Sequence, residues 1–469
     1  MIPTAIVYQT NNMKNTRCLR NWFGYLLVAM GISVFTGGCS VEVDKKEERP
    51  PNIVLIMADD LGYETISANG GQSYQTPRID KMAEEGMRFE QCYAQPLCTP
   101  SRVQIMTGIY NVRNYVRFGL LHPSQTTFAH LLKEAGYVTC IIGKWQLGKQ
   151  LDSPKKAGFD YHNLWQVTKG ATDSTGRDTR FSQPELQVDG EIIRYDRSTY
   201  GPDVVSEYGL DFIRKSHDKN QPFFLYYPMI LTHCPFSATP DSEEYLTDSL
   251  TVMKYKGKAP YFPDMMSYTD KIVGKIMDEL DRLQIAENTL VIFTGDNGTD
   301  RPIQSIINDQ IVAGAKNKTT DAGTRVPLIA YWPGKIKSGK VNSNLIDFSD
   351  FLPTLMDASG VSTEQLDLDG KSFYKQLISA EETGREWIYC WYSRNGEDEK
   401  RQVFARNEQF KLYEDGRFYE VPIDSLESRP MDTESLEGEH LRVYNQLFEV
   451  ISEYDQRRLD AIPADQLNE

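Results

Sequence analysis

The chain has 469 residues, of which 40% are hydrophobic and 25% are charged, and its formal net charge at pH 7 is −15. This composition is typical of a globular enzyme, and the length accommodates one large domain plus a smaller one. The acidic balance argues against nucleic-acid binding, because a phosphate backbone requires clustered Lys and Arg, so an anionic substrate would need a local concentration of positive charge.

The first 38 residues predict a secretory signal. A basic start (14–20) precedes the apolar run YLLVAMGISVF, which is too short for a membrane-spanning helix. The run ends in TGGC (36–39), which resembles the lipobox of bacterial lipoproteins. This resemblance implies that Cys39 is lipidated and becomes the mature N-terminus, followed by a solvated tether up to residue 50. The alternative is a plain signal that carries a cysteine by chance.

Apolar strand patterns and amphipathic helix patterns alternate through the next three hundred residues. The predicted strands are NIVLIM (52–57), MRFEQCYA (87–94), YVTCIIG (137–143), PFFLYYPMI (222–230), TLVIFTG (289–295) and VPLIAYW (326–332). The predicted helices are 78–86, a helix that follows the QPLCTPSR turn and runs to 106, 126–136, 204–216 and 267–283. This alternation predicts an α/β fold with a large, doubly wound mixed sheet flanked by helices, which we assign to a catalytic domain at 51–365.

The pattern changes after about residue 366. Short segments at 387–392, 401–406, 409–416 and 417–421 are typical of antiparallel strands, and a helix is predicted at 441–459. We therefore predict a small C-terminal antiparallel α+β subdomain at 366–469.

Two polar pairs follow buried strands at positions where sites gather in α/β sheets, namely the carboxyl ends of the strands. Asp59 and Asp60 follow the first strand, and Asp296 and Asn297 follow TLVIFTG. One such pair alone is more often a turn former. Two pairs at the same end of a sheet favour a metal site, and ligands that are all oxygen suit Ca²⁺ or Mg²⁺ rather than zinc.

Basic residues occur at the same kind of position. Lys144 follows the strand YVTCIIG, His233 follows PFFLYYPMI, and Lys316 precedes VPLIAYW. Each of them alone is usually a surface charge. Together they predict a sulfate or phosphate pocket beside the metal pairs.

Cys98 stands at a predicted helix N-terminus in QPLCTPSRVQIMTG, with Arg102 one turn inside the helix. Such an end favours anions. The pattern alone leaves three readings of the thiol: a nucleophile, a buried structural group, or a precursor of another group. Apart from Cys98, Cys18 and Cys39, the cysteines are at positions 92, 140, 234 and 390, and their spacing makes zinc binding unlikely and predicts no particular disulfide pairing.

These motifs together resemble the type I sulfatases of the alkaline phosphatase superfamily. Cys98 to Arg102 fit the family signature Cys-x-Pro-Ser-Arg. The remaining landmarks follow in the family's order and spacing: NIVLIMADDLG, GYVTCIIGKWQLG, LTHCPF, IFTGDNG, TTDAGTRVPLIAYWPG, DFSDFLPTLMDASG and LDGKSF. The resemblance covers roughly residues 50 to 450.

The resemblance implies a mechanism. In the family, a formylglycine-generating or anaerobic sulfatase-maturating enzyme converts the signature cysteine to formylglycine (3-oxoalanine), whose hydrate attacks sulfur and later expels sulfate by re-forming the aldehyde. By position, one Ca²⁺, in preference to Mg²⁺, is held by residues 59, 60, 296, 297 and the modified Cys98. Arg102 steadies the hydrate, Lys144 and Lys316 bind sulfate oxygens, and His233 is the general acid.

The chain departs from the family pattern at two places. Gln146 replaces the histidine of GKWHLG that is expected to take a proton during release, and a glutamine cannot accept a proton at neutral pH. Asp321-Ala322-Gly323 replaces the usual Glu-Gly-Gly.

The sequence thus predicts a secreted sulfatase, anchored by its N-terminal lipid at the outer membrane, on its periplasmic or surface face. We expect the substrate to be a sulfated polysaccharide, such as ulvan, or its oligosaccharides. We expect no nucleic-acid partner. Two alternatives remain: a phosphodiester or phosphonate monoester hydrolase of the same superfamily, and a sulfoglycan-binding lipoprotein without turnover, which Gln146 keeps open.

Overall fold

A computed structural model describes residues 49–168, 170–245, 256–379 and 384–458 of the chain. The predicted signal and the lipidation site at Cys39 lie outside these residues. Within the described part of the chain, no helix combines the length and the apolar character that crossing a membrane requires.

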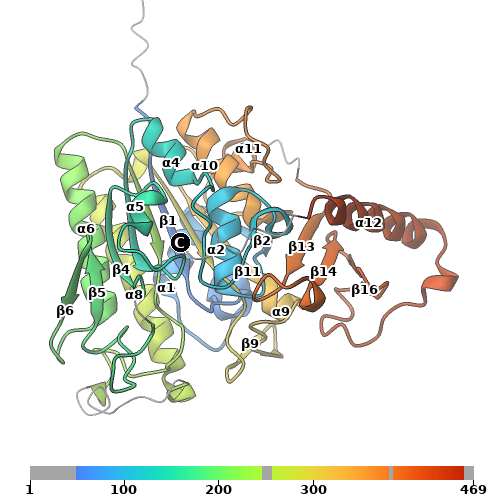
Figure 1. Ribbon diagram of the computed structural model, residues 1–469, viewed down its shortest axis with the longest axis horizontal. Helices are drawn as coiled ribbons and strands as arrows, with labels where there is room; N and C mark the ends of the chain where they lie inside the picture. The colour runs from blue at the N-terminus through green and yellow to red at the C-terminus, as the bar shows by residue number, and fades with distance from the viewer. Residues whose placement is uncertain (1–48, 169, 246–255, 380–383, 459–469) are drawn as a thin grey trace, which may run out of the picture. The chain divides into compact units, whose positions relative to one another are not determined.

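A ten-stranded mixed sheet forms the centre of the described chain (Figure 1). In spatial order its strands are β12 Lys340–Asp347, β2 Met87–Tyr93, β11 Arg325–Tyr331, β8 Thr289–Gly295, β1 Asn52–Ala58, β7 Phe223–Pro228, β3 Val138–Lys144, β4 Tyr161–Trp165, β5 Glu185–Val188 and β6 Glu191–Arg194. The strands β8, β1, β7, β3 and β4 run parallel, whereas β11 is antiparallel to both of its neighbours, and β5 and β6 form an antiparallel edge. The predicted large mixed sheet is therefore confirmed.

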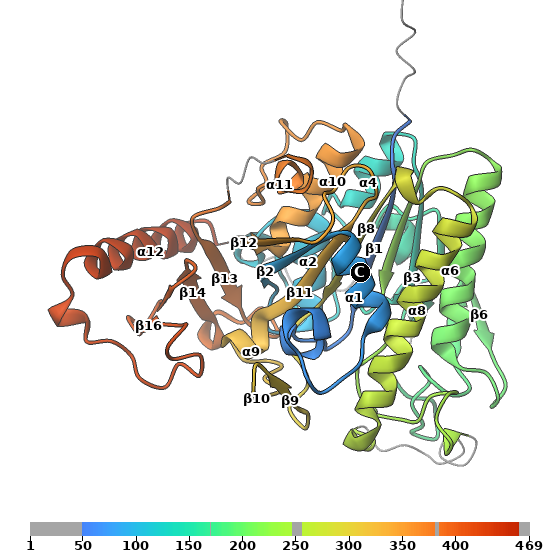
Figure 2. The same ribbon diagram turned by 180° about the vertical axis from the view of Figure 1, so that it is seen from behind.

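Helices cover both faces of this sheet (Figure 2). One face carries α1 Pro77–Glu85, α6 Gly201–Asp218 and α8 Phe262–Arg282, and the other carries α2 Cys98–Thr107, α4 Phe128–Glu134 and α10 Phe351–Ser359. The shorter helices are α3 Asn111–Asn114, α5 Ser153–Lys156, α9 Asp321–Thr324 and α11 Tyr374–Ile378.

The central strand β1 shows why two layers of helices are needed. Ile53, Leu55 and Met57 point into the core on the side of α2, α4 and α10, and the alternate residues Val54 and Ile56 point into the core under α1, α6 and α8. Successive side chains of a strand face opposite sides. A continuous apolar run such as NIVLIM therefore requires burial on both faces, as the sequence predicts.

A separate four-stranded antiparallel sheet follows near the C-terminus, in the order β13 Ile388–Tyr392, β14 Gln402–Arg406, β15 Phe410–Tyr413 and β16 Phe418–Glu420. The helix α12 Gly438–Gln456 packs on this sheet through Val443, Leu447 and Ile451. The small C-terminal antiparallel α+β unit is therefore confirmed, while the boundary between residues 365 and 366 stays a prediction.

Several elements had no clear signal in the sequence. They are the edge strands β4 to β6, the strand β12, the helix α10 and the hairpin of β9 Gln304–Ile307 and β10 Gln310–Ala313. The strand β12 reads KVNSNLID, and three of its first four residues are exposed, so it lacks the apolar run that marks the central strands.

Candidate active site

The two acidic pairs meet at the carboxyl ends of adjacent strands. Asp59 and Asp60 directly follow β1, Asp296 and Asn297 directly follow β8, and all four side chains are fully buried. A Cβ atom on Gly295 would lie 2.0 Å from a backbone oxygen of the loop after β1, so glycine allows this close approach. The structure thus brings together all four residues that the sequence predicts as metal ligands.

Hydrogen bonds order this cluster, but one ligand atom has no partner. The backbone N–H of Asp60 donates to Asp296 Oδ1 (3.0 Å), and the amide of Asn297 donates to Asp60 Oδ1 (2.9 Å). The carbonyl oxygen of Asn297, Oδ1, is buried and accepts no hydrogen bond from the described residues. A buried acceptor without a partner is costly, and a bound cation would satisfy it.

The carboxylates repel each other in this setting. Burial and the negative charge of Asp59 raise the pKa of Asp296 to about 7. Burial also raises the pKa of Asp59, but the charges of Lys144 and Arg102 outweigh that effect, so the net shift is downward. A divalent cation bound among these carboxylates would favour the charged form of Asp296.

Cys98 is the first residue of α2, as its sequence context predicts. Its sulfur lies within 4.8 Å of a carboxylate oxygen of Asp59 and one of Asp296, and its thiol donates a hydrogen bond to Gln146 Oε1 (3.3 Å). Burial raises the pKa of the Cys98 thiol. The unmodified side chain is therefore a poor thiolate nucleophile at neutral pH.

Each predicted lysine contacts a different carboxylate of the cluster. Lys144, the last residue of β3, places its Nζ 2.8 Å from Asp59, and Lys316 places its Nζ 2.6 Å from Asp60. Both lysines also line the cavity above the cluster. An anion in that cavity would therefore meet two ammonium groups that the carboxylates hold in place.

Arg102 lies one turn inside α2 and is almost fully buried. Its guanidinium lies 3.3 Å from Asp296 Oδ2 and donates to the backbone oxygen of Lys144 (2.9 Å). Arg102 therefore ties the helix that carries Cys98 to the ends of β8 and β3.

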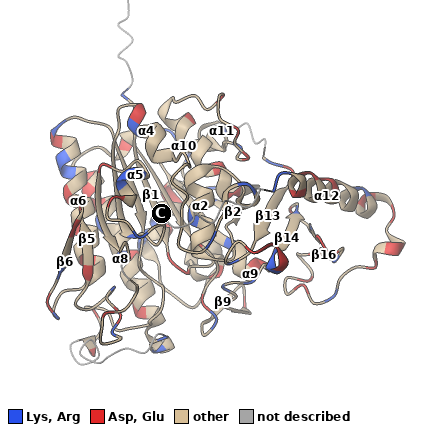
Figure 3. Ribbon diagram, viewed as in Figure 1, with Lys and Arg blue, Asp and Glu red and all other residues tan. Residues whose placement is uncertain are grey.

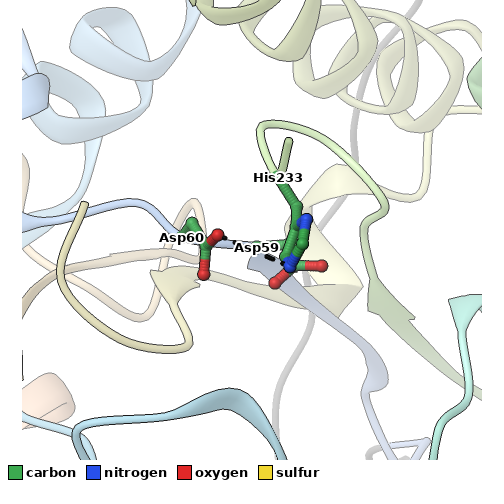
Figure 4. Close-up of side chains that lie close together, drawn as sticks. All are labelled: Asp59, Asp60 and His233. Atoms are coloured by element: carbon green, nitrogen blue, oxygen red, sulfur yellow. Dashed lines mark ion pairs between the residues drawn. The ribbon is translucent and has the colours of Figure 1, made fainter. Parts of the chain in front are cut away.

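His233 lies in the loop after β7 and faces the cluster (Figure 4). Its Nε2 lies 3.7 Å from Asp60 Oδ2, and its Nδ1 lies 2.7 Å from a guanidinium nitrogen of Arg180. Burial and the charge of Lys316 hold the pKa of His233 well below its usual value.

A cavity of about 710 Å³ opens above these residues. Its polar lining includes Lys144, Lys316, Arg180, Arg301 and Arg394. Lys and Arg are interspersed with Asp and Glu over the elements of the described chain (Figure 3), so this group of cations is a local feature of an acidic protein. The cavity has the size of a pocket for a small ligand and the charge of an anion site.

The two departures from the family pattern lie in different places. Gln146 lies in the site, where it lines the cavity and contacts Cys98. Asp321 begins α9 and pairs with the buried Arg406 of β14 at 2.6 Å. This second departure therefore concerns the contact with the C-terminal sheet.

Sequence reasoning missed Arg180, Trp165 and Gln166 among the cavity residues. Arg180 and Gln166 lie between β4 and β5, in a segment without helical or strand periodicity. No sequence signal marks Arg180 as a site residue. It stands in the polar sequence DTR (178–180), and an arginine in a polar loop is most often a surface charge.

Comparison with known proteins identifies the family. The Sulfatase family model matches residues 51–361, which is more than half of the chain, and the model described as N-sulphoglucosamine sulphohydrolase, C-terminal, matches residues 316–456. The chain belongs to the sulfatase family. It is therefore a sulfuric ester hydrolase, and the resemblance seen in its motifs is confirmed.

Relatives and solved structures agree with this assignment. The sulfatase is 32% identical to N-acetylgalactosamine-6-sulfatase of Mus musculus, over 73% of this chain and 69% of that one. It is likewise 32% identical to arylsulfatase A of Homo sapiens, over 78% of this chain and 75% of that one. Its fold is similar to the crystal structure of Ps i-CgsB, with a TM-score of 0.72, 24% identity and coverage of 90% of this chain and 97% of that one.

Proposed function

We propose that this sulfatase removes sulfate from a sulfated carbohydrate, and that polysaccharides such as ulvan or their oligosaccharides are its substrates. The observation that carries the proposal is the cavity of about 710 Å³, lined by cations, above the buried cluster of Cys98 and the carboxylates. The names of relatives support the carbohydrate: one is N-acetylgalactosamine-6-sulfatase. A structure of similar fold (TM-score 0.69, 22% identity) was solved with its substrate D-glucosamine-2-N,6-O-disulfate.

The residues of the cluster fit a Ca²⁺ ion. Asp59, Asp60, Asp296 and Asn297 would hold it, because they offer hard oxygen atoms only, and the partnerless Oδ1 of Asn297 faces no competing donor among the described residues. When bound, the ion supplies positive charge that offsets the carboxylates and attracts the sulfate ester.

We further propose that a maturating enzyme converts Cys98 to formylglycine. Two observations support the conversion: the Cys-x-Pro-Ser-Arg sequence, and the burial that disfavours the thiolate of the unmodified residue. An aldehyde that forms a hydrate offers an oxygen nucleophile at this position without requiring a charged sulfur.

The chain's own residues then have separate tasks. Lys144 and Lys316 bind sulfate oxygens and stabilise the charge that develops on them. Arg102 holds α2, and with it residue 98, against the strand ends. His233 presents its Nε2 to the cavity, where it donates toward the ester oxygen that leaves.

Sulfate release tests this function. The matured enzyme is expected to release sulfate, and no phosphate, when matched aryl sulfates, aryl phosphates and phosphonate monoesters are compared. A panel of sulfated oligosaccharides, including fragments of ulvan, then identifies the sugar. Cys98→Ala is the matched control, which should fold and release nothing. Phosphate release in preference to sulfate would contradict the proposal, and so would binding of the oligosaccharides without turnover.

We also propose that Cys39 carries a lipid that anchors the enzyme outside the cytoplasm. The support is the TGGC sequence after an apolar run near the N-terminus. Radiolabelled palmitate should enter the wild-type chain and not a Cys39→Ser variant when both are expressed in a Gram-negative host. A wild-type chain that takes up no label in that host would contradict the anchor.

A further inference from the structure

We propose that Arg180 is a positioning residue that sets the tautomer of His233, so that Nδ1 is a hydrogen-bond acceptor and Nε2 carries the proton that faces the substrate. The tautomer itself is inferred from the geometry around the imidazole ring. Its effect on the kinetics rests on the proposed function.

Arg180 is built into the site as a fixed group. It is only 2% exposed, its Nε donates to both carboxylate oxygens of Asp178 (3.0 and 3.2 Å), and its guanidinium lies 4.1 Å from the centre of the Trp165 ring. The ion pair and the ring hold the guanidinium from two sides. One of its terminal nitrogens is thereby placed 2.7 Å from His233 Nδ1.

A guanidinium can only donate hydrogen bonds. The 2.7 Å contact is therefore a hydrogen bond when Nδ1 of His233 offers its lone pair to Arg180, which leaves the ring proton on Nε2. Nε2 lies on the other side of the ring, where it faces the cavity, 3.7 Å from a carboxylate oxygen of Asp60 (Figure 4). A proton on Nε2 is therefore within reach of a ligand in the cavity.

A competing acceptor makes Arg180 necessary. The backbone oxygen of Cys234 lies 2.5 Å from the same Nδ1 and would accept a proton from it. Without Arg180, we expect the tautomer that carries its proton on Nδ1 and donates it to this carbonyl. Nε2 would then present a lone pair to the substrate, and the donor would be lost.

The tautomer defines what His233 can do. With Nδ1 occupied by Arg180, the ring donates a hydrogen bond from Nε2 but has no second proton to give away. The ester oxygen leaves with the electron pair of the S–O bond, is stabilised by this hydrogen bond as its negative charge grows, and takes its proton from water. His233 is then a hydrogen-bond donor in the transition state, which refines the role of general acid that the family implies.

Nitrogen-15 NMR of the wild-type holoenzyme tests the tautomer directly. The chain has six histidines, and the His233 signals are assigned by their absence from a His233→Gln variant. We expect an unprotonated Nδ1 and a protonated Nε2 in the wild type, and the reverse in Arg180→Met. A protonated Nδ1 in the wild type would overturn the proposal, even if Arg180→Met failed to fold.

Kinetics with defined aryl sulfates test the consequence. Because the hydrogen bond matters most when the leaving oxygen is basic, Arg180→Met should lose at least about ten-fold more kcat on phenyl sulfate than on 4-nitrophenyl sulfate. KM should change little. The control is Arg194→Met, which removes an exposed arginine of β6 that pairs with Glu185.

The outcomes separate the possible failures. Equal losses on both esters with a raised KM would make Arg180 a substrate contact and overturn the positioning role. Equal activity of Arg180→Met and wild type would overturn it as well. A wild-type enzyme without sulfate release would instead contradict the proposed function, while the NMR result would still decide the tautomer.

Discussion

The side-chain oxygen of Gln146 accepts a hydrogen bond from the thiol of Cys98 at 3.3 Å, and Gln146 adopts a positive φ of 50°. This conformation is unfavourable for a residue with a Cβ and is found where the surrounding structure enforces it. The residue that departs from the family motif is therefore held directly against the proposed nucleophile.

Replacing Gln146 tests the release step. If a histidine normally takes a proton during release, a glutamine slows the breakdown of the sulfated enzyme, because base assistance is worth about a hundred- to ten-thousand-fold. Pre-steady-state kinetics with an aryl sulfate should show a burst of phenol and then slow turnover. Gln146→His should speed the slow phase more than the burst. A wild type without a burst, and a variant changed only in KM, would make Gln146 a substrate contact instead.

Removal of the metal should cost both activity and stability. Added Ca²⁺ should raise the Tm of the chelated enzyme, since a ligand present at about a hundred times its Kd stabilises by about 2.7 kcal/mol. Asp296→Ala should abolish activity and the shift in Tm, because it removes a buried ligand. Asp278→Asn, a change in an exposed ion pair, is the control and should keep both. Full activity after chelation with no metal found by elemental analysis would exclude the ion.

His162 predicts a pH dependence of folding away from the site. It is buried in β4, neither ring nitrogen has a partner among the described residues, and burial lowers its pKa to about 4. The unfolded chain binds this proton near pH 6.5 and the folded chain near pH 4, so stability is lost as pH falls between these values. The loss reaches about 3 kcal/mol below pH 4.

Denaturant titrations between pH 7 and pH 4 check this effect. His162→Leu should show a smaller fall in the free energy of unfolding than wild type over that range, whereas His217→Leu, which alters an exposed histidine of α6, should not. Parallel curves of the free energy of unfolding against pH for wild type and His162→Leu would contradict this prediction, because they would show that folding does not change the pKa of His162.

The pair of Asp321 and Arg406 should stabilise the contact between the main sheet and the C-terminal sheet. Arg406 is 1% exposed, pairs with Asp321 at 2.6 Å and lies over the ring of Tyr93. Arg406→Met leaves a carboxylate without its partner and should cost about 3 kcal/mol. Arg417→Met, at a largely exposed pair, should cost at most about 1 kcal/mol. Equal midpoints of denaturation for the two variants would contradict this role.

Much of the site could be predicted because its residues follow unmistakable strands. Runs such as NIVLIM and TLVIFTG can only be buried, so the polar residues after them had to lie at the sheet edge where sites form. Cys98 was placed at a helix start for a similarly local reason, the proline within its first turn.

The rest depends on relationships that sequence patterns do not encode. Arg180 reaches His233 only because β4, which precedes the loop of Arg180, pairs with β3, and β3 pairs with β7. The order of strands in a sheet is a tertiary property. The antiparallel direction of β11 and the polar edge strand β12 are set by packing rather than by periodicity.

The mass of one peptide tests the central claim most directly. Trypsin should release Phe89–Arg102, which contains Cys98 and also Cys92 as an internal control. In active enzyme, treated with an alkylating reagent after unfolding, we expect Cys92 to be alkylated. Residue 98 should carry an aldehyde in place of its thiol, with the loss of one sulfur and two hydrogens and the gain of one oxygen, and should resist alkylation. A peptide alkylated at both cysteines, from enzyme with full sulfatase activity, would contradict the account.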